Sequence, residues 1–196
     1  AMSFMNFFGS LAFFIGTWSN GNASLCTWQG FTLQINSAVF TYNGILALNF
    51  LLRIRFEVSE ATILRAEPLF HLVGWCYPTI TAFVALGLRM YSGPGPLWCW
   101  ISTAWDWARW AFFYVPLWCI MIFSTVAMFM IVQKVVESDR RTRAHLNTGP
   151  TSAKKQKHSR RTREVAVQAI LFVCSFLLTW VFGTANRIQN AVAPCP

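Results

Sequence analysis

The sequence predicts an all-α fold, a polytopic membrane helix bundle with five spans. The chain has 196 residues, of which 55% are hydrophobic and 12% charged, and its formal net charge is +9. Soluble domains have about a quarter charged residues, so this composition excludes a disordered chain and disfavours a soluble globular fold. Because one transmembrane helix takes about 20 apolar residues, the length leaves room for five spans and their loops.

The spans follow from runs of the sequence that contain no Asp, Glu, Lys or Arg. Four such runs are long enough to cross a bilayer: residues 31–52, 69–88, 111–133 and 165–186. Residues 1–18 form a shorter uncharged run, which we interpret as an incomplete helix. The alternative, a signal peptide, would have a positive n-region and a clear cleavage site. We expect one transmembrane domain fragment over residues 1–196, with spans at about 1–18, 31–52, 69–90, 111–136 and 162–187.

The distribution of Lys and Arg predicts the orientation of these spans. Residues 134–164 contain ten of the sixteen basic residues, residues 53–67 contain three, and the rest of the chain contains three. By the positive-inside bias, the cytoplasmic loops are 53–68 and 137–161, and the outer loops are 19–30 and 91–110. The positive charge therefore indicates topology, and no nucleic-acid partner is expected.

Two features of the predicted outer side agree with this orientation. Asn22-Ala23-Ser24 is an N-glycosylation sequon in the first outer loop, which predicts glycosylation of Asn22. Cys26 and Cys99 both face an oxidising environment, so we expect a disulfide between them, with free thiols as the alternative. The cysteines inside the spans are interpreted as small packing residues, and Cys195 has no obvious partner.

The spans lack the residues that most membrane enzymes and transporters need. His71 is the one ionisable side chain in the uncharged runs, near the cytoplasmic end of its helix, whereas transporters and ion channels usually keep several such groups in the membrane. The predicted spans contain no His and Glu pair at zinc-binding spacing, and the sequence has no Gly-x-Ser-x-Gly motif and no phosphate-binding glycine loop. We therefore predict no enzymatic activity, no cofactor and no metal site.

Uncharged polar residues are frequent in the second predicted span. Asn36 and Asn43 are seven residues apart and share one helix face, where only neighbouring helices or water can pair with their amides. Interhelical hydrogen bonding is one interpretation, and a polar core that rearranges is the other. Pro78 and Pro116 predict kinks in two further spans, because each removes a backbone hydrogen bond.

Four motifs carry a resemblance to a known family. They are Cys26-Thr-Trp-Gln-Gly-Phe31 leading into Gln34, Leu97-Trp-Cys-Trp-Ile101, Phe113-Tyr-Val-Pro-Leu-Trp118, and Trp180 followed by Asn186-Arg-Ile-Gln-Asn190. In this order and spacing the chain resembles the cyclic-AMP-receptor-like (class E, slime-mould type) G-protein-coupled receptors. The resemblance implies a partial seven-transmembrane receptor fold, in which the five spans correspond to helices two to six. Leu52-Arg-Ile-Arg-Phe56 lacks the acidic-Arg-aromatic triplet of rhodopsin-like receptors.

The resemblance implies a receptor in the plasma membrane that transmits the signal of an extracellular ligand, cyclic AMP or another small molecule, to a heterotrimeric G protein. An anionic ligand needs cationic or amide donors and a flat apolar surface. The candidate ligand-binding residues are Arg187, Arg89, Arg109, Trp100 and Asn36. The outer Trp residues also fit an aromatic belt at the membrane interface. The alternative function is a non-signalling membrane scaffold or a transporter-like helix bundle.

The predicted cytoplasmic surface is strongly basic. We expect its arginines to contact the G protein or anionic membrane lipid, whose attraction amounts to about 1 kcal/mol per basic residue. These candidate residues are Arg53, Arg55, Arg140, Arg141, Arg143, Arg160, Arg161 and Arg163.

Overall fold

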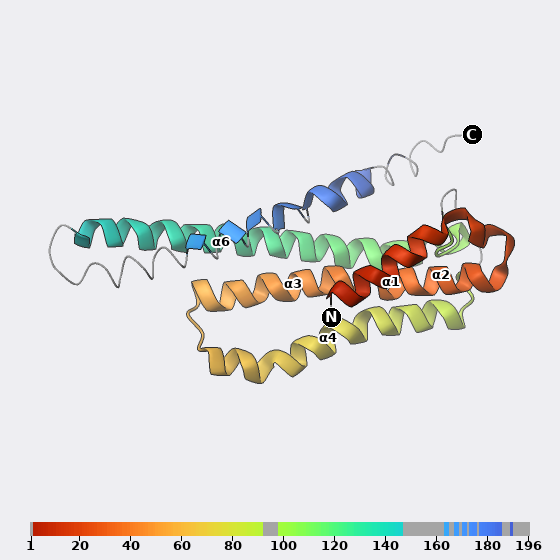
Figure 1. The fold of residues 1–196 in the computed structure, drawn as a ribbon, viewed down its shortest axis with the longest axis horizontal. Coiled ribbons are helices and arrows are strands. Elements are labelled where there is room, and N and C mark those ends of the chain that lie inside the picture. The colour runs from red at the N-terminus through yellow and green to blue at the C-terminus, as the bar shows by residue number, and fades with distance from the viewer. Residues whose placement is uncertain are drawn as a thin grey trace. The chain divides into compact units, whose positions relative to one another are not determined.

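The structure, a computed structural model, describes residues 2–91 and 98–146, and also 163–164, 167–168, 170–171, 173–175, 177–185 and 189. The described residues form helices joined by turns, with no β-strand element among them (Figure 1). The predicted all-α helical bundle is therefore confirmed.

Ten helical elements are assigned within residues 2–146, and they are of three types: α, 3₁₀ and π. The α-helices are α1 (Met2–Ile15), α2 (Ala23–Ile35), α3 (Ala38–Phe50), α4 (Glu60–Gly87), α5 (Asp106–Arg109) and α6 (Val115–Leu146). The 3₁₀-helices are η1 (Gly16–Gly21) and η3 (Thr103–Trp105). Two π-helical turns, η2 (Leu51–Arg55) and η4 (Trp110–Tyr114), continue α3 and precede α6.

Three helical stretches of the described residues are long and apolar enough to cross a membrane. They are Ala23–Arg55, Glu60–Gly87 and Thr103–Ser138, and a shorter apolar helix covers Val173–Ala185. Large apolar side chains are exposed along α4 at Leu69, Leu72, Ile80 and Phe83, as expected of a face that contacts lipid rather than water. These helices support a multi-pass membrane protein. The five-span arrangement stays a prediction.

The ends of α2 and α6 differ from the edges of the apolar runs. α2 begins at Ala23, before the span predicted from residue 31, because the Asn22 side chain accepts hydrogen bonds from the backbone N–H groups of Ser24 and Leu25 at 3.0 and 3.2 Å. α6 continues to Leu146, past the apolar part of the predicted span. Hydropathy therefore marks the stretch suited to the membrane, whereas the Asn22 cap decides where α2 starts.

The chain divides into two compact units. The first comprises Ala1–Ile45 and Arg65–Ile120, and the second comprises Leu46–Leu64 and Met121–Pro196. In the first unit α1 packs along α2, as the red and orange ribbons of Figure 1 show. The second unit has an apolar core of buried side chains, made by Ala47, Leu51, Ala127, Met128, Ile131 and Val173.

The junction of α2 and α3 interrupts the regular helix at Asn36 and Ser37. The backbone N–H groups of Ser37, Val39 and Phe40 bond to carbonyls three residues earlier, as in a 3₁₀ turn. The Asn36 side chain lies against Gly9 of α1, where a Cβ atom would come within 2.3 Å of its amide nitrogen. Only glycine fits at position 9 with Asn36 in this place.

Candidate functional site

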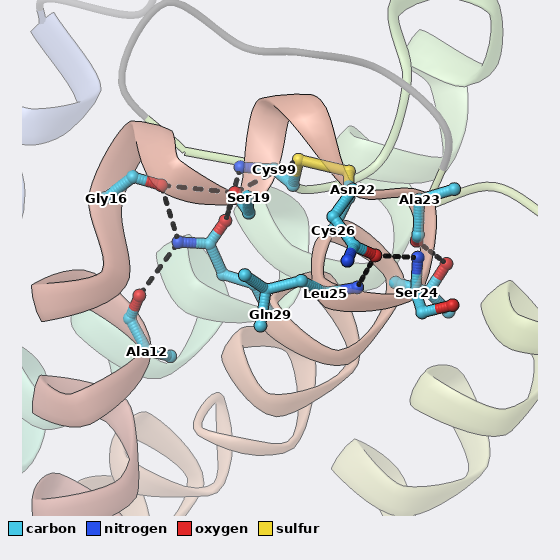
Figure 2. Close-up of a disulfide and its surroundings, with 11 residues drawn as sticks. Ala12, Gly16, Ser19, Asn22, Ala23, Ser24, Leu25, Cys26, Gln29 and Cys99 are labelled. Atoms are coloured by element: carbon cyan, nitrogen blue, oxygen red, sulfur yellow. Dashed lines mark hydrogen bonds between the residues drawn. A yellow bond between two sulfur atoms is a disulfide. The ribbon is translucent and has the colours of Figure 1, made fainter.

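The disulfide predicted from the sequence is present. Cys26 of α2 is bonded to Cys99, with 5.1 Å between their Cα atoms, a separation usual for disulfides (Figure 2). Cys99 lies in the segment between α4 and η3, so the bond attaches this segment to the first turn of α2. We call the surrounding part of the first unit the disulfide end. Four of the five residues predicted to bind ligand belong to the first unit: Asn36, Arg89, Trp100 and Arg109.

Gln29 is the centre of a buried hydrogen-bond network beside the disulfide. Its side chain is 0% exposed, and its Nε2 donates to the carbonyls of Ala12 and Gly16 at 2.8 and 3.2 Å. Its Oε1 accepts from the backbone N–H of Cys99 at 2.7 Å and from the Ser19 hydroxyl at 2.6 Å, as Figure 2 shows. Gln29 thus satisfies all its donors and acceptors while joining α1, η1 and the Cys99 segment.

Gln34 is a second glutamine whose buried amide joins separate segments, and it lies about one and a half helical turns after Gln29 on α2. Its side chain is also 0% exposed, and its Nε2 donates to Thr81 Oγ1 of α4 at 3.2 Å and to the Phe112 carbonyl at 3.3 Å. The Trp100 indole N–H donates to Gln34 Oε1 at 3.2 Å. One amide side chain therefore positions α4, the π-helical turn η4 and the indole of Trp100.

The Phe112 carbonyl is an acceptor for side chains because of Pro116. Proline has no N–H to donate to the carbonyl four residues before it, and that carbonyl belongs to Phe112. The Tyr77 hydroxyl of α4 donates to it at 2.9 Å, in addition to the bond from Gln34. Pro116, which the sequence predicts to kink its span, is preceded by the π-helical turn η4.

Aromatic rings pack around Trp100 at the disulfide end. Its ring centroid is 5.1 Å from that of Phe113 and 6.3 Å from that of Tyr114, both in edge-to-face contact. Phe113 contacts Phe40 of α3 at 5.4 Å, and Tyr114 contacts Trp110 at 5.0 Å. Trp100 remains partly exposed, so this cluster presents an aromatic surface of the kind that binds flat apolar groups.

Two of the predicted cationic ligand residues already have structural contacts. Arg109 donates through Nε to the Ile101 carbonyl at 2.7 Å, and its Nη1 lies 3.7 Å from the Asp106 carboxylate. Arg89 is exposed and has a left-handed backbone with φ of 51°. The hydrogen bonds from Met90 N–H to Ala85 and from Arg89 N–H to Leu86 make it the left-handed residue of a Schellman cap on α4.

The remaining predicted site residues lie at several positions in the chain. Arg187, Arg160 and Arg161 lie outside the described residues, as do the contacts of the Arg143 side chain. Asn36 is at the α2–α3 junction, and its Oδ1 has no hydrogen-bond partner among the described residues. Asn22, the predicted glycosylation site, is exposed and caps α2. The remaining predicted contact residues are exposed on the second unit or α6: Arg53, Arg55, Arg140, Arg141 and Arg163.

The basic residues of the second unit are partly paired with carboxylates. Lys134 Nζ is 2.8 Å from Glu57 Oε1, and Arg53 Nη1 is 3.7 Å from Glu60 Oε1. The hydrogen bond and positive charge of Lys134 lower the pKa of Glu57 below its ordinary value. On α6, Arg141 pairs with Glu137 one turn earlier.

Sequence reasoning did not single out three residues of this site: Gln29, Thr81 and Tyr77. Gln29 is 70 positions from Cys99 and Gln34 is 47 from Thr81, so no local pattern connects these partners. The available signal was a glutamine on an otherwise apolar helix, since a buried amide must find hydrogen-bond partners. Pro116 likewise indicated a carbonyl without its helical donor.

The family profile described as "Slime mold cyclic AMP receptor" matches residues 8–196. Cyclic AMP receptor 4 of Dictyostelium discoideum is 27% identical over 172 residues, covering 85% of this chain and 36% of that protein. Cyclic AMP receptor 1 of the same organism is 25% identical over 85% of this chain and 41% of its own length. The protein named G-protein coupled receptor 1 of Arabidopsis thaliana is 22% identical, covering 93% of this chain and 55% of its own length.

The chain matches only part of the length of these relatives. It spans between 36% and 55% of the length of the three relatives above. The matched region includes the disulfide, both buried glutamines and the aromatic cluster, because all of them lie between residues 8 and 196.

Proposed function

Because this chain belongs to the slime mold cyclic AMP receptor family, we propose that it is the core of a G-protein-coupled receptor for a small extracellular molecule. The ligand class we propose is cyclic AMP or another small molecule with a flat apolar group. The receptor lies in the plasma membrane, with the disulfide end outside and the loops 53–68 and 137–161 in the cytoplasm. The basic distribution of the sequence supports this orientation.

The observation that carries the proposal is the position of Trp100. The disulfide fixes Cys99, the neighbouring residue, to α2, and Gln34 holds the Trp100 indole against Phe113 and Tyr114. A partly exposed ring held by a covalent bond on one side and a buried amide on the other is preorganised for a flat ligand. Arg89, Arg109, Arg187 and Asn36 are the proposed polar partners of that ligand.

A ligand that binds here would shift the helices that Gln34 joins. The amide contacts α4 through Thr81 and the turn before α6 through the Phe112 carbonyl. A ligand that displaces Trp100 would remove a hydrogen bond to Gln34 and would therefore alter the hydrogen bonds of Gln34 to Thr81 and to the Phe112 carbonyl. Such a differential contact is what a ligand needs in order to shift an equilibrium between two helix packings. The proposed readout is a heterotrimeric G protein at the cytoplasmic loops, where anionic lipid is the proposed second contact.

The test uses the full-length protein that contains this chain, expressed in cells with a heterotrimeric G protein. We expect cyclic AMP, or one member of a panel of nucleotides and amines, to stimulate nucleotide exchange. Trp100→Ala should raise the concentration needed for half-maximal exchange by about tenfold, as loss of a central aromatic contact does, at unchanged surface expression. Trp18→Ala is the matched control, because Trp18 is 80% exposed.

Two results would contradict the proposal. Absence of exchange with every ligand would favour a non-signalling scaffold or a transporter-like bundle. Equal responses of the wild type and the Trp100→Ala variant at equal surface expression would remove Trp100 from the ligand site, while leaving receptor activity in place.

A further inference from the structure

A histidine and a glutamate lie one helical turn apart on α4, and both are exposed. His71 Nε2 is 3.7 Å from Glu67 Oε1, and the two side chains are 52% and 57% exposed. Because α4 continues as a helix through Pro68, the four-residue spacing puts both side chains on the same helix face. Glu67 lies outside the uncharged run 69–88 that contains His71, which is why the uncharged runs alone predict no metal site.

The separation of the two atoms is too long for a hydrogen bond and matches the span of a bridging metal ion. Hydrogen bonds between nitrogen and oxygen are about 2.7–3.2 Å long. Zinc binds histidine nitrogen and carboxylate oxygen at about 2.0–2.2 Å, so two ligand atoms on a tetrahedral ion are about 3.4 Å apart. The observed 3.7 Å between His71 and Glu67 differs from that value by a few tenths of an ångström.

Tyr42 of α3 holds the other nitrogen of the imidazole. Its hydroxyl is 2.9 Å from His71 Nδ1, and its buried ring packs on Gly74 of α4, where a Cβ atom would come within 3.0 Å of Tyr42 Cζ. A metal ion on Nε2 requires the ring proton on Nδ1, and the Tyr42 oxygen is then the acceptor of that N–H. A fixed acceptor on the second nitrogen is the usual companion of a metal-binding histidine.

We propose that Glu67 and His71 bind a zinc ion, with Tyr42 as the positioning residue that orients His71. The described residues contain no group of three or more His, Cys, Asp or Glu side chains that could hold a metal. Water therefore completes the coordination, and binding is weaker than at a structural site with four protein ligands. Zinc on Nε2 fixes the direction of the hydrogen bond that joins α3 to α4. This inference does not depend on the ligand or the G protein proposed above.

The binding test is calorimetric titration of zinc chloride into the full-length protein that contains this chain, purified in detergent. Tyr42→Phe should weaken zinc binding by about tenfold, as loss of an outer-shell partner does. Glu67→Gln and His71→Gln remove a ligand and should each weaken it further. Glu60→Gln is the matched control, because Glu60 is another exposed carboxylate of α4, and it should bind zinc like the wild type. Unchanged zinc affinity in both Glu67→Gln and His71→Gln would overturn the site.

Two further variants separate a metal site from a simple ion pair. Ala66→Glu combined with Glu67→Ala keeps the charge of α4 but moves the carboxylate off the face of His71, so zinc binding should stay weak. Glu67→His puts a second imidazole at the same spacing. Two histidines can bind zinc together but form no ion pair, so zinc binding should be retained. Wild-type affinity in the shifted variant, or loss of binding in Glu67→His, would contradict the metal site.

Amide hydrogen exchange measures the effect of zinc on α4. At a zinc concentration ten times the dissociation constant, exchange of residues 64–72 in the wild type should become about tenfold slower, because a ligand of the folded state opposes local opening. In His71→Gln the same zinc concentration should leave exchange unchanged. Equal slowing in both proteins would show that zinc acts elsewhere and would overturn the assignment. Receptor activity enters none of these measurements, so failure of the proposed function and failure of the zinc site are distinguishable.

Discussion

The Tyr77 hydroxyl donates a 2.9 Å hydrogen bond to the backbone carbonyl of Phe112, the carbonyl that Pro116 leaves without its helical N–H donor. Because Pro116 has no N–H, the carbonyl of Phe112 is open to the hydroxyl of Tyr77 on another helix. Gln34 shares the same carbonyl, so three segments of the first unit meet at one backbone oxygen.

This relationship predicts non-additive effects of Tyr77→Phe and Pro116→Ala. Tyr77→Phe should destabilise the protein by about 1 kcal/mol, the net value of one hydrogen bond, lowering the melting temperature in detergent. Pro116→Ala restores an N–H that can bond to Phe112, so Tyr77→Phe should have a smaller effect in that background. Thermal unfolding of the two single variants and the double variant measures the coupling. Strict additivity would show that the two residues act on different acceptors.

Gly30 is predicted to tolerate no larger residue. A Cβ atom there would come within 2.6 Å of Tyr91 Cδ1, and the Tyr91 hydroxyl is held by the Ala82 carbonyl at 3.2 Å. Gly30→Ala should therefore destabilise the protein by about 1–3 kcal/mol through overpacking. Gly183→Ala is the control, since no atom of the described residues lies within 4 Å of its added Cβ, and should be neutral or slightly stabilising. Equal melting temperatures for both variants would contradict the close approach.

Two substitutions can show whether Arg89 binds the ligand or only caps α4. Its left-handed φ of 51° is the position that glycine prefers at a Schellman cap. Arg89→Gly should stabilise the fold by about 0.5–1 kcal/mol, whereas Arg89→Ala keeps the strain. Both remove the charge, so both should weaken binding of an anionic ligand equally if Arg89 contacts it. Unaltered ligand affinity in both variants would show that Arg89 does not contact the ligand and acts only in the cap of α4.

Asn22 is predicted to have separable roles in capping and glycosylation. Asn22→Ala should remove the cap of α2 and cost about 1 kcal/mol, whereas Ser24→Ala removes the sequon and keeps the Asn22 side chain. Melting temperatures report the cap, and a mobility shift after glycosidase treatment reports the glycan. A wild-type protein with no such shift would contradict glycosylation, and equal stability of the two variants would contradict the cap.

The disulfide predicts equivalent effects of its two cysteines. Cys26→Ser and Cys99→Ser should each lower stability by about 2–5 kcal/mol, the usual loss for a native disulfide. The double variant should be no worse than either single one, because one covalent bond is removed in all three. Surface expression and thermal unfolding measure this. Losses that add up in the double variant would show that the two thiols act independently.

Much of this fold could be predicted because its signals are local. Uncharged runs indicated membrane helices, and Cys26 and Cys99 could be paired because both fall on the predicted outer side. The partners of Gln29 and Gln34 could not be predicted, because a glutamine can bond to any donor or acceptor that the packing brings near it. The role of Arg89 was also hidden, since a Schellman cap usually has glycine at that position.

The sequence by itself indicated a multi-pass membrane protein and its family, because hydropathy, charge bias and the order of short motifs can be read along the chain. Only the tertiary structure decided which polar groups meet at the disulfide end. Gln34, Trp100, Thr81 and Phe112 come from four separate segments, and their meeting depends on helix packing. In an apolar surrounding each buried polar group must find a partner, and packing alone selects which one.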